Sequence, residues 1–294
     1  MTDAVRVVRL ATRGSAQATA QSTVVAESLM AAHPGLRVDL VLVETLGDQR
    51  TDIPLHQMGG QGVFVKEVQR AVLSGDADIA VHSAKDLPSV TADGLALAAL
   101  CERRDARDAL VGASLAALPL GATVATGSVR RRAQLQAVRP DLSFVELRGN
   151  IATRLSKLPE GGALVMAVAA LQILGLTDRI AEALPVEEFV PSPGQGCVAI
   201  ECRSDDASTI GLLAAVDHAP TRARVAAERA FLAELGTGCS LPVAAHVVDG
   251  VLHAFLAGDD GAVAREVLEL GGDTAGWNQR AAALAGAMRA RVER

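Results

Sequence analysis

The sequence predicts a mixed α/β protein with more than one domain, and three observations support this. Apolar strand-like segments alternate with helical segments over most of the 294-residue chain. The opening strand–turn–helix pattern at 10–15 returns at 124–128, which indicates two similar lobes. Near the C-terminus, short strands separated by turns such as Asp249-Gly250 indicate a small antiparallel sheet and a third domain.

Composition excludes several classes of protein. Hydrophobic residues make up 50% and charged residues 21%, so the chain can bury a sizeable core. A net charge of −6 and 2% aromatic residues, with no tyrosine, argue against a nucleic-acid partner. No apolar run spans a membrane and no signal peptide is recognisable, so we expect no membrane partner and a cytoplasmic location. The four scattered cysteines predict neither a disulfide framework nor a zinc site.

The first junction between a strand and a helix is a candidate anion site. Residues 5–11 read as a strand, and a helix follows to about His33. Ser15 is a candidate N-cap, and a helix N-terminus with Arg13 beside it attracts anions. An ordinary capped helix with a surface arginine is the alternative, and it is favoured if this junction is taken alone. Further elements are expected at 38–45 (strand), 63–73 (helix, after a glycine-rich loop at 59–62) and 95–100 (strand).

A second candidate site follows the apolar strand that ends near Val81. Pro88 prevents a helix from running back through Asp86, which therefore lies on a loop beside Lys85 at the carboxyl end of the strand. Ligands bind at such strand ends in open α/β sheets. The alternative is a solvated Lys–Asp pair on a turn, because charged side chains mostly face water.

The second lobe is rich in arginine. Ser128 is the candidate N-cap of a helix that carries the triplet at 130–132, and Asn150 is the candidate N-cap of a helix at 151–158. Strands are expected at 142–147 and 163–168. Arginine binds carboxylates bidentately, and four arginines fall within 25 residues: Arg130, Arg131, Arg148 and Arg154. A triplet cannot share one helical face, so at least one member points away from any site.

The remaining segments lead to a cysteine in a tight loop. A turn-rich crossover at 191–196 precedes a strand at 197–202, in which Cys197 and Cys202 act as small apolar residues. Cys239 lies between glycines and Pro242, where a thiol is either exposed and reactive or buried and inert. The other expected elements are helices at 206–216 and 220–235, strands at 243–248, 251–256 and 263–268, and a helix from about 274.

Taken together, these segments resemble the hydroxymethylbilane synthase (porphobilinogen deaminase) family from about Arg6 to the end. The matching motifs occur in the family's order. They are Ala-Thr-Arg-x-Ser at 11–15, His-Ser-x-Lys-Asp-Leu-Pro at 82–88, Ser-x-Arg-Arg at 128–131, Arg-Gly-Asn at 148–150 with Arg154, Pro-Gly-Gln-Gly at 193–196, and Gly-Cys-x-x-Pro at 238–242.

The resemblance implies three domains. Two are α/β lobes like those of periplasmic binding proteins, and the third is a small α+β domain with an antiparallel sheet. Domain 1 would comprise 1–101 with 197–216, domain 2 would comprise 102–196, and domain 3, with the cysteine loop, would comprise 217–294.

The resemblance also implies an activity. The enzyme condenses four porphobilinogen molecules head to tail with loss of ammonia, on a dipyrromethane cofactor attached through a thioether to Cys239. Asp86 would be the catalytic carboxylate. The cofactor would be bound by Lys85, Asp86, Ser128, Arg130 and Arg131, and the substrate by Arg13, Ser15, Arg148 and Arg154. No metal is needed, and a monomer acting on a small molecule is expected.

Two positions depart from the family's pattern. Gln61 stands where the glycine loop usually has lysine, and Ile173 stands where a Leu-x-Arg-Leu-Gly segment usually has arginine. These departures suggest an enzyme that holds its substrate or growing chain more weakly. The alternatives are that neighbouring basic residues compensate, that the alignment of Ile173 is shifted by one residue, or that the chain is a divergent relative with reduced activity. A rival hypothesis is a two-lobed binding protein for a small anion, without catalysis.

Overall fold

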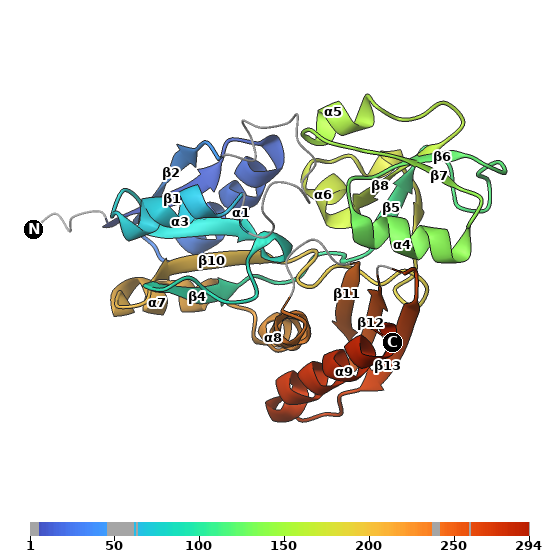
Figure 1. Cartoon of the computed structure of the whole chain (residues 1–294). Coiled ribbons are helices and arrows are strands. Elements are labelled where there is room, and N and C mark those ends of the chain that lie inside the picture. Colours follow the sequence, from blue (N-terminus) through green and yellow to red (C-terminus); the bar gives the residue numbers. More distant parts are fainter. Residues whose placement is uncertain (1–5, 46–61, 63, 237–241, 259, 294) are drawn as a thin grey trace, which may run out of the picture. The chain divides into compact units, whose positions relative to one another are not determined.

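The computed structural model describes residues 6–45, 62, 64–236, 242–258 and 260–293 (Figure 1). These residues form two five-stranded sheets and one three-stranded sheet. They divide into two compact units. The first holds the described residues up to Arg103 together with Cys197–Arg222. The second holds Arg104–Gly196 and the described residues from Ala223 onward.

Lobe 1, in the first unit, is built on a sheet with the strand order β2-β1-β3-β10-β4. Strand β1 pairs in parallel with β2 and β3, whereas β10 runs antiparallel between β3 and β4. The strands are β1 (Arg6–Arg13), β2 (Leu36–Val43), β3 (Ile79–Ser83), β4 (Leu95–Leu100) and β10 (Val198–Arg203). The helices are α1 (Ala16–Ala32), α3 (Lys66–Leu73) and α7 (Ala207–Leu213).

Helices bury both faces of this sheet. On one face, Leu29 of α1 packs in a cluster with Val8 and Leu10 of β1. On the other face, Val68 of α3 packs in a cluster with Ala80 of β3. Because both faces are covered, the central strands are apolar on both sides, as is usual for parallel sheets.

Lobe 2, in the second unit, has the strand order β7-β6-β8-β5-β9. Strand β6 is parallel to β7 and β8, whereas β5 runs antiparallel between β8 and β9. The strands are β5 (Asp108–Val111), β6 (Thr123–Ala125), β7 (Ser143–Val145), β8 (Ala163–Ala167) and β9 (Ile180–Ala183). The helices are α4 (Val129–Val138), α5 (Ile151–Leu155) and α6 (Val168–Ile173).

The two sheets share one topology, which fits the repeated sequence pattern. Strand β6 takes the place of β1, β8 that of β3, and β5 that of β10. The antiparallel strand of each sheet is the first strand after the chain has crossed from the other lobe. Strand β5 of lobe 2 follows β4 of lobe 1, and β10 of lobe 1 follows β9 of lobe 2. Each lobe therefore places one helix N-terminus after the equivalent strand, α1 after β1 and α4 after β6.

Among the described strands and α-helices, β5, β9 and α6 were not predicted from the sequence. Strand β5 has four residues, all buried, and follows a run of charged residues. So short a segment shows no periodicity of its own, and its pairing with β8 and β9 depends on residues far along the chain. The predicted helix at 151–158 ends earlier, at Leu155.

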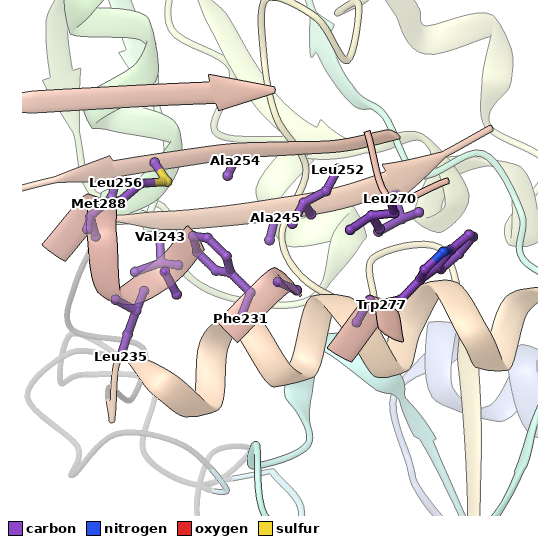
Figure 2. Packing of buried hydrophobic residues seen from close by; sticks show 14 of the residues in the cluster. Phe231, Leu235, Val243, Ala245, Leu252, Ala254, Leu256, Leu270, Trp277 and Met288 are labelled. Carbon is purple, nitrogen blue, oxygen red and sulfur yellow. The ribbon is translucent and has the colours of Figure 1, made fainter. Parts of the chain in front are cut away.

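The C-terminal domain pairs a three-stranded antiparallel sheet with two helices. The sheet comprises β11 (Val243–Val248), β12 (Val251–Ala257) and β13 (Val263–Glu269), and the helices are α8 (Ala219–Glu234) and α9 (Trp277–Val292). Figure 2 shows Phe231 of α8, Trp277 and Met288 of α9, and Leu252 of β12 in one apolar cluster.

The other face of this small sheet packs on lobe 2 within the second unit. Phe255 of β12 lies in a cluster with Val190, which precedes the crossover. Glu228 of α8 is fully buried, and its two carboxylate oxygens accept hydrogen bonds from the backbone N–H groups of Gly194 and Val247, both at 2.8 Å. This carboxylate therefore ties α8 to the crossover and to β11.

The sheets confirm the predicted mixed α/β class, with two α/β lobes of the same strand order and a small α+β domain with an antiparallel sheet. The three-domain division at 101/102, 196/197 and 216/217 stays a prediction, because the contacts group lobe 2 with the C-terminal domain. Within the described ranges, none of the helices is long and apolar enough to cross a membrane.

We predict that Phe231→Ala lowers the free energy of unfolding by ~3–5 kcal/mol, because it leaves a cavity where the ring packs. Urea unfolding followed by circular dichroism measures the change. Leu120→Ala is the matched control, since Leu120 is 89% exposed, and it should change stability by less than ~0.5 kcal/mol. Equal effects of the two substitutions would contradict the packing described here.

Candidate functional site

Asp86 lies at the carboxyl end of β3, the middle strand of lobe 1, as expected. The sequence predicted a plain loop, whereas residues Ala84–Asp86 form a single 3₁₀ turn closed by a 3.3 Å bond from the Leu87 N–H to the Ala84 carbonyl. Leu87 is extended, as a residue before proline must be, so the turn cannot continue. Lys85 and Asp86 are both half-buried.

Polar contacts hold the end of β3 on both faces of the sheet. On the α1 side, the Ser83 hydroxyl donates to Gln21 Oε1 at 3.1 Å. On the α3 side, Gln69 Nε2 donates to Glu201 Oε2 at 2.8 Å, and His82 Nε2 lies 3.3 Å from the same oxygen. These side chains fix the backbone that leads into the turn with Asp86.

The first strand–helix junction has the predicted N-cap, whereas β1 extends to Arg13, two residues further than predicted. Ser15 is the N-cap of α1, and its hydroxyl accepts a hydrogen bond from the Ala18 N–H at 3.3 Å. Arg13 ends β1, and its guanidinium carbon lies 4.1 Å from the centroid of the Phe64 ring. Because β1 and β3 are parallel neighbours, Arg13, Ser15 and Asp86 lie at the same edge of the sheet.

The equivalent junction in lobe 2 is built in the same way. Ser128 is the N-cap of α4, and its hydroxyl accepts from the Arg131 N–H at 3.4 Å. Gly127 precedes it, and a Cβ there would lie 2.7 Å from the Leu147 carbonyl oxygen, so only glycine fits without a shift. The close approach of residue 127 to the segment after β7 brings these loops together.

Arg130 and Arg131 are buried against one carboxylate. Asp108, the first residue of β5, is fully buried. Its Oδ2 accepts from Arg130 Nη1 at 2.6 Å, and its Oδ1 accepts from Arg131 Nη2 at 2.6 Å and Nε at 2.9 Å. Arg132 is exposed and stacks near Phe144, so the triplet divides between buried and solvent-facing members.

Each arginine of this buried pair also binds a backbone carbonyl. Arg130 Nη1 also donates to the Val190 oxygen, and Arg131 Nη1 donates to the Val165 oxygen, both at 2.9 Å. Burial alone would raise the pKa of Asp108, but the two guanidinium groups outweigh it and hold that pKa well below its usual range. Asp108 is the residue of this site that the sequence analysis missed, and it carries no local signal.

Arg148 and Arg154 lie beyond β7 in lobe 2. Asn150 caps α5 as predicted, with its Oδ1 accepting from the Thr153 N–H at 2.9 Å. Arg154 Nε donates to the Gly149 oxygen at 2.8 Å, and Gly149 adopts a φ of 111° that favours glycine. Arg148 is nine-tenths buried.

The predicted residues thus form two groups, one in each compact unit. Lobe 1 holds Arg13, Ser15, Lys85 and Asp86, and lobe 2 holds Ser128, Arg130, Arg131, Arg148 and Arg154. Cys239 and Gln61 lie outside the described residues. Ile173 ends α6 and is half-buried, and it belongs to none of the apolar clusters found among the described residues.

The donors of each group, taken by itself, suit the carboxylates of an anionic ligand. They are guanidinium and ammonium groups together with serine-capped helix N-termini. A search of the described part of the chain finds no group of three His, Cys, Asp or Glu side chains that could hold a metal ion.

Strand order and paired strand–helix junctions define a two-lobed α/β protein with an added C-terminal domain. The family model "porphobilinogen deaminase, dipyromethane cofactor binding domain" matches residues 8–211. The model for the C-terminal domain of porphobilinogen deaminase matches residues 222–281. The chain belongs to the porphobilinogen deaminase family.

Some solved structures are similar at low identity. The methionine-binding protein MetQ is 16% identical with a TM-score of 0.46, covering 74% of this chain and 92% of its own. A nutrient-binding protein from Burkholderia cenocepacia, bound to methionine, is 15% identical with a TM-score of 0.44, covering 73% and 93%. The periplasmic VFT2 domain of BvgS from Bordetella pertussis is 17% identical with a TM-score of 0.43, covering 71% and 86%.

We predict that Asp108 makes stability depend on acid pH. Its pKa is lowered in the folded state, so its stabilising effect is complete above the unfolded pKa of ~4 and is lost as the pH falls towards the folded value. Asp108→Asn should therefore lose ~3–5 kcal/mol at pH 7, and its stability should fall less steeply between about pH 5 and 2. Urea unfolding at a series of pH values tests this, and parallel curves for the two proteins would contradict it.

Proposed function

We propose that this protein is a deaminating transferase that condenses four porphobilinogen molecules head to tail into hydroxymethylbilane. The observation that carries the proposal is the match of the family models to both lobes and to the C-terminal domain. The position of Asp86 at the carboxyl end of β3 adds support, because ligands bind at that edge of α/β sheets. That the protein acts as a cytoplasmic monomer stays a prediction.

The cofactor-binding residues fit a group with several carboxylates. Arg130, Arg131 and Lys85 supply positive charge, and Ser128 opens a helix whose N-terminal N–H groups favour anions. A dipyrromethane bound at this site would supply the pyrrole carbon to which the first substrate is joined. Arg13, Ser15, Arg148 and Arg154 would hold the acetate and propionate groups of incoming porphobilinogen.

Asp86 is the proposed catalytic carboxylate. When the aminomethyl group of porphobilinogen loses ammonia, positive charge develops on the pyrrole nitrogen. A carboxylate beside that nitrogen stabilises the charge, and it can accept the proton that is released when the new carbon–carbon bond forms. Lys85, next in the chain, can bind a ligand carboxylate and so direct the ring towards Asp86.

Cys239 is the proposed attachment point. Burial raises the pKa of Cys101 and Cys202 to about 11, so those thiols are poor nucleophiles near neutral pH. Cys197 is 2% exposed. The three cysteines within the described ranges are therefore unsuited to covalent attachment, which favours Cys239 in the family's Gly-Cys-x-x-Pro motif.

We predict that the intact mass exceeds the sequence mass by two condensed pyrrole units and that Cys239→Ser abolishes this excess. The purified protein should also give a coloured adduct with an acidic aldehyde reagent for pyrroles. Peptide mapping locates the attachment site. An adduct on Cys197 or Cys202 would refute the assignment, and the complete absence of a pyrrole adduct would favour the rival anion-binding protein.

We predict that Asp86→Asn keeps the fold and lowers kcat by ~10²-fold or more, because one electrostatic group of this kind typically contributes that much. The matched control is Asp93→Asn, which alters an exposed carboxylate of the same lobe and should leave turnover unchanged. Porphobilinogen consumption and the thermal transition are measured together. Near-normal turnover of Asp86→Asn with an intact transition would show that another group performs this role.

A further inference from the structure

Asp108 is a buried carboxylate to which the proposed reaction assigns no contact with substrate or cofactor. It accepts four side-chain hydrogen bonds, three from Arg130 and Arg131 and one from Gln195 Nε2 at 3.0 Å. We propose that Asp108 is a positioning residue that, with Gln195, fixes the orientation and the net charge of the arginine pair for carboxylate binding. The identity of the ligand rests on the proposed function, whereas the pairing itself does not.

The charge balance at the pair supports this inference. Two guanidinium groups face one carboxylate, so the cluster keeps one net positive charge that can attract a ligand carboxylate. A second uncompensated charge in so buried a place would be costly. The Nε and Nη2 groups of Arg130 have no hydrogen-bond partner among the described residues, so these donors remain for a ligand.

The geometry of the pair supports it as well. Both Nη1 hydrogens of Arg130 are used, one by Asp108 and the other by the Val190 oxygen. This fixes the plane of the guanidinium group and the direction of its remaining donors. Arg131 is held in the same way between Asp108 and the Val165 oxygen of β8. Loss of Asp108 would release both side chains at once.

Gln195 links this cluster to the crossover that leads from lobe 2 into β10. It is 1% exposed, and its Nε2 donates both to Asp108 and to the Ala106 oxygen, the latter at 2.7 Å. Gly196 has a φ of 83°, and a Cβ there would lie 2.8 Å from the Arg104 oxygen. The crossover backbone is thus fixed beside β5, and Gln195 can hold Asp108 in one orientation.

The first test measures thermal midpoints in sodium propionate and in sodium chloride at equal ionic strength. In chloride, Asp108→Asn should melt several degrees below the wild type. Propionate should restore at least half of that loss, because it supplies a carboxylate to the arginine pair that has lost its partner charge. Asp141→Asn is the control, since Asp141 pairs with Arg139 at the surface of the same lobe, and propionate should leave it unchanged. Equal propionate effects on all proteins, or an unchanged midpoint of Asp108→Asn in chloride, would overturn the proposal.

A second variant decides the matter if Asp108→Asn does not fold. Gln195→Met removes the amide but keeps a side chain of similar size and leaves Asp108 in place. The KM for porphobilinogen should rise at least threefold while the thermal midpoint changes little. A lower midpoint with an unchanged KM would show a purely structural role and overturn the proposal. If the wild type does not turn over porphobilinogen, the proposed function is wrong. The propionate experiment still tests the positioning role of Asp108, because it does not depend on turnover.

Discussion

A single buried carboxylate organises lobe 2. Asp108 neutralises one of two guanidinium charges that would otherwise be buried without compensation. Its partners are Arg130 and Arg131 of α4 and Gln195 of the crossover. The two arginines in turn donate to carbonyl oxygens of β8 and of the segment before the crossover. Removing this interaction would loosen α4, the antiparallel strand β5 and the connection to β10 together.

Because both lobes have the same topology, the candidate site residues lie at equivalent strand ends. In each lobe a serine caps the helix that follows the equivalent strand, and the middle strand ends at that same edge of the sheet. In lobe 1 the middle strand leads to Asp86, and polar side chains secure its end on both faces. In lobe 2 the middle strand leads into α6, which has no counterpart of Asp86. Among the described residues, the repeat therefore supplies two candidate anion-binding junctions and one candidate catalytic carboxylate at the end of a middle strand.

The helix caps and several strands were predictable from the sequence, because they depend on residues close together in the chain. The caps at Ser15, Ser128 and Asn150 were expected because these side chains accept hydrogen bonds from N–H groups three residues on. Strand 95–100 and strand 243–248 were placed correctly because apolar residues are bounded by turns. Asp108 was not singled out, because its role depends on partners that are 22 and 87 residues away in the chain. Ile173 was expected to leave the binding site without one positive contact, and its half-buried place at the end of α6 leaves that prediction open.

The proposed reaction joins porphobilinogen units covalently to this chain before product is released. The most direct measurement is the intact mass of the protein quenched at short times after mixing with porphobilinogen. The account predicts a series of covalent species separated by equal steps, each the mass of one porphobilinogen less one ammonia, that disappears as product is released. A mass that never changes, while porphobilinogen binds reversibly, would contradict the account and identify the protein as an anion-binding relative.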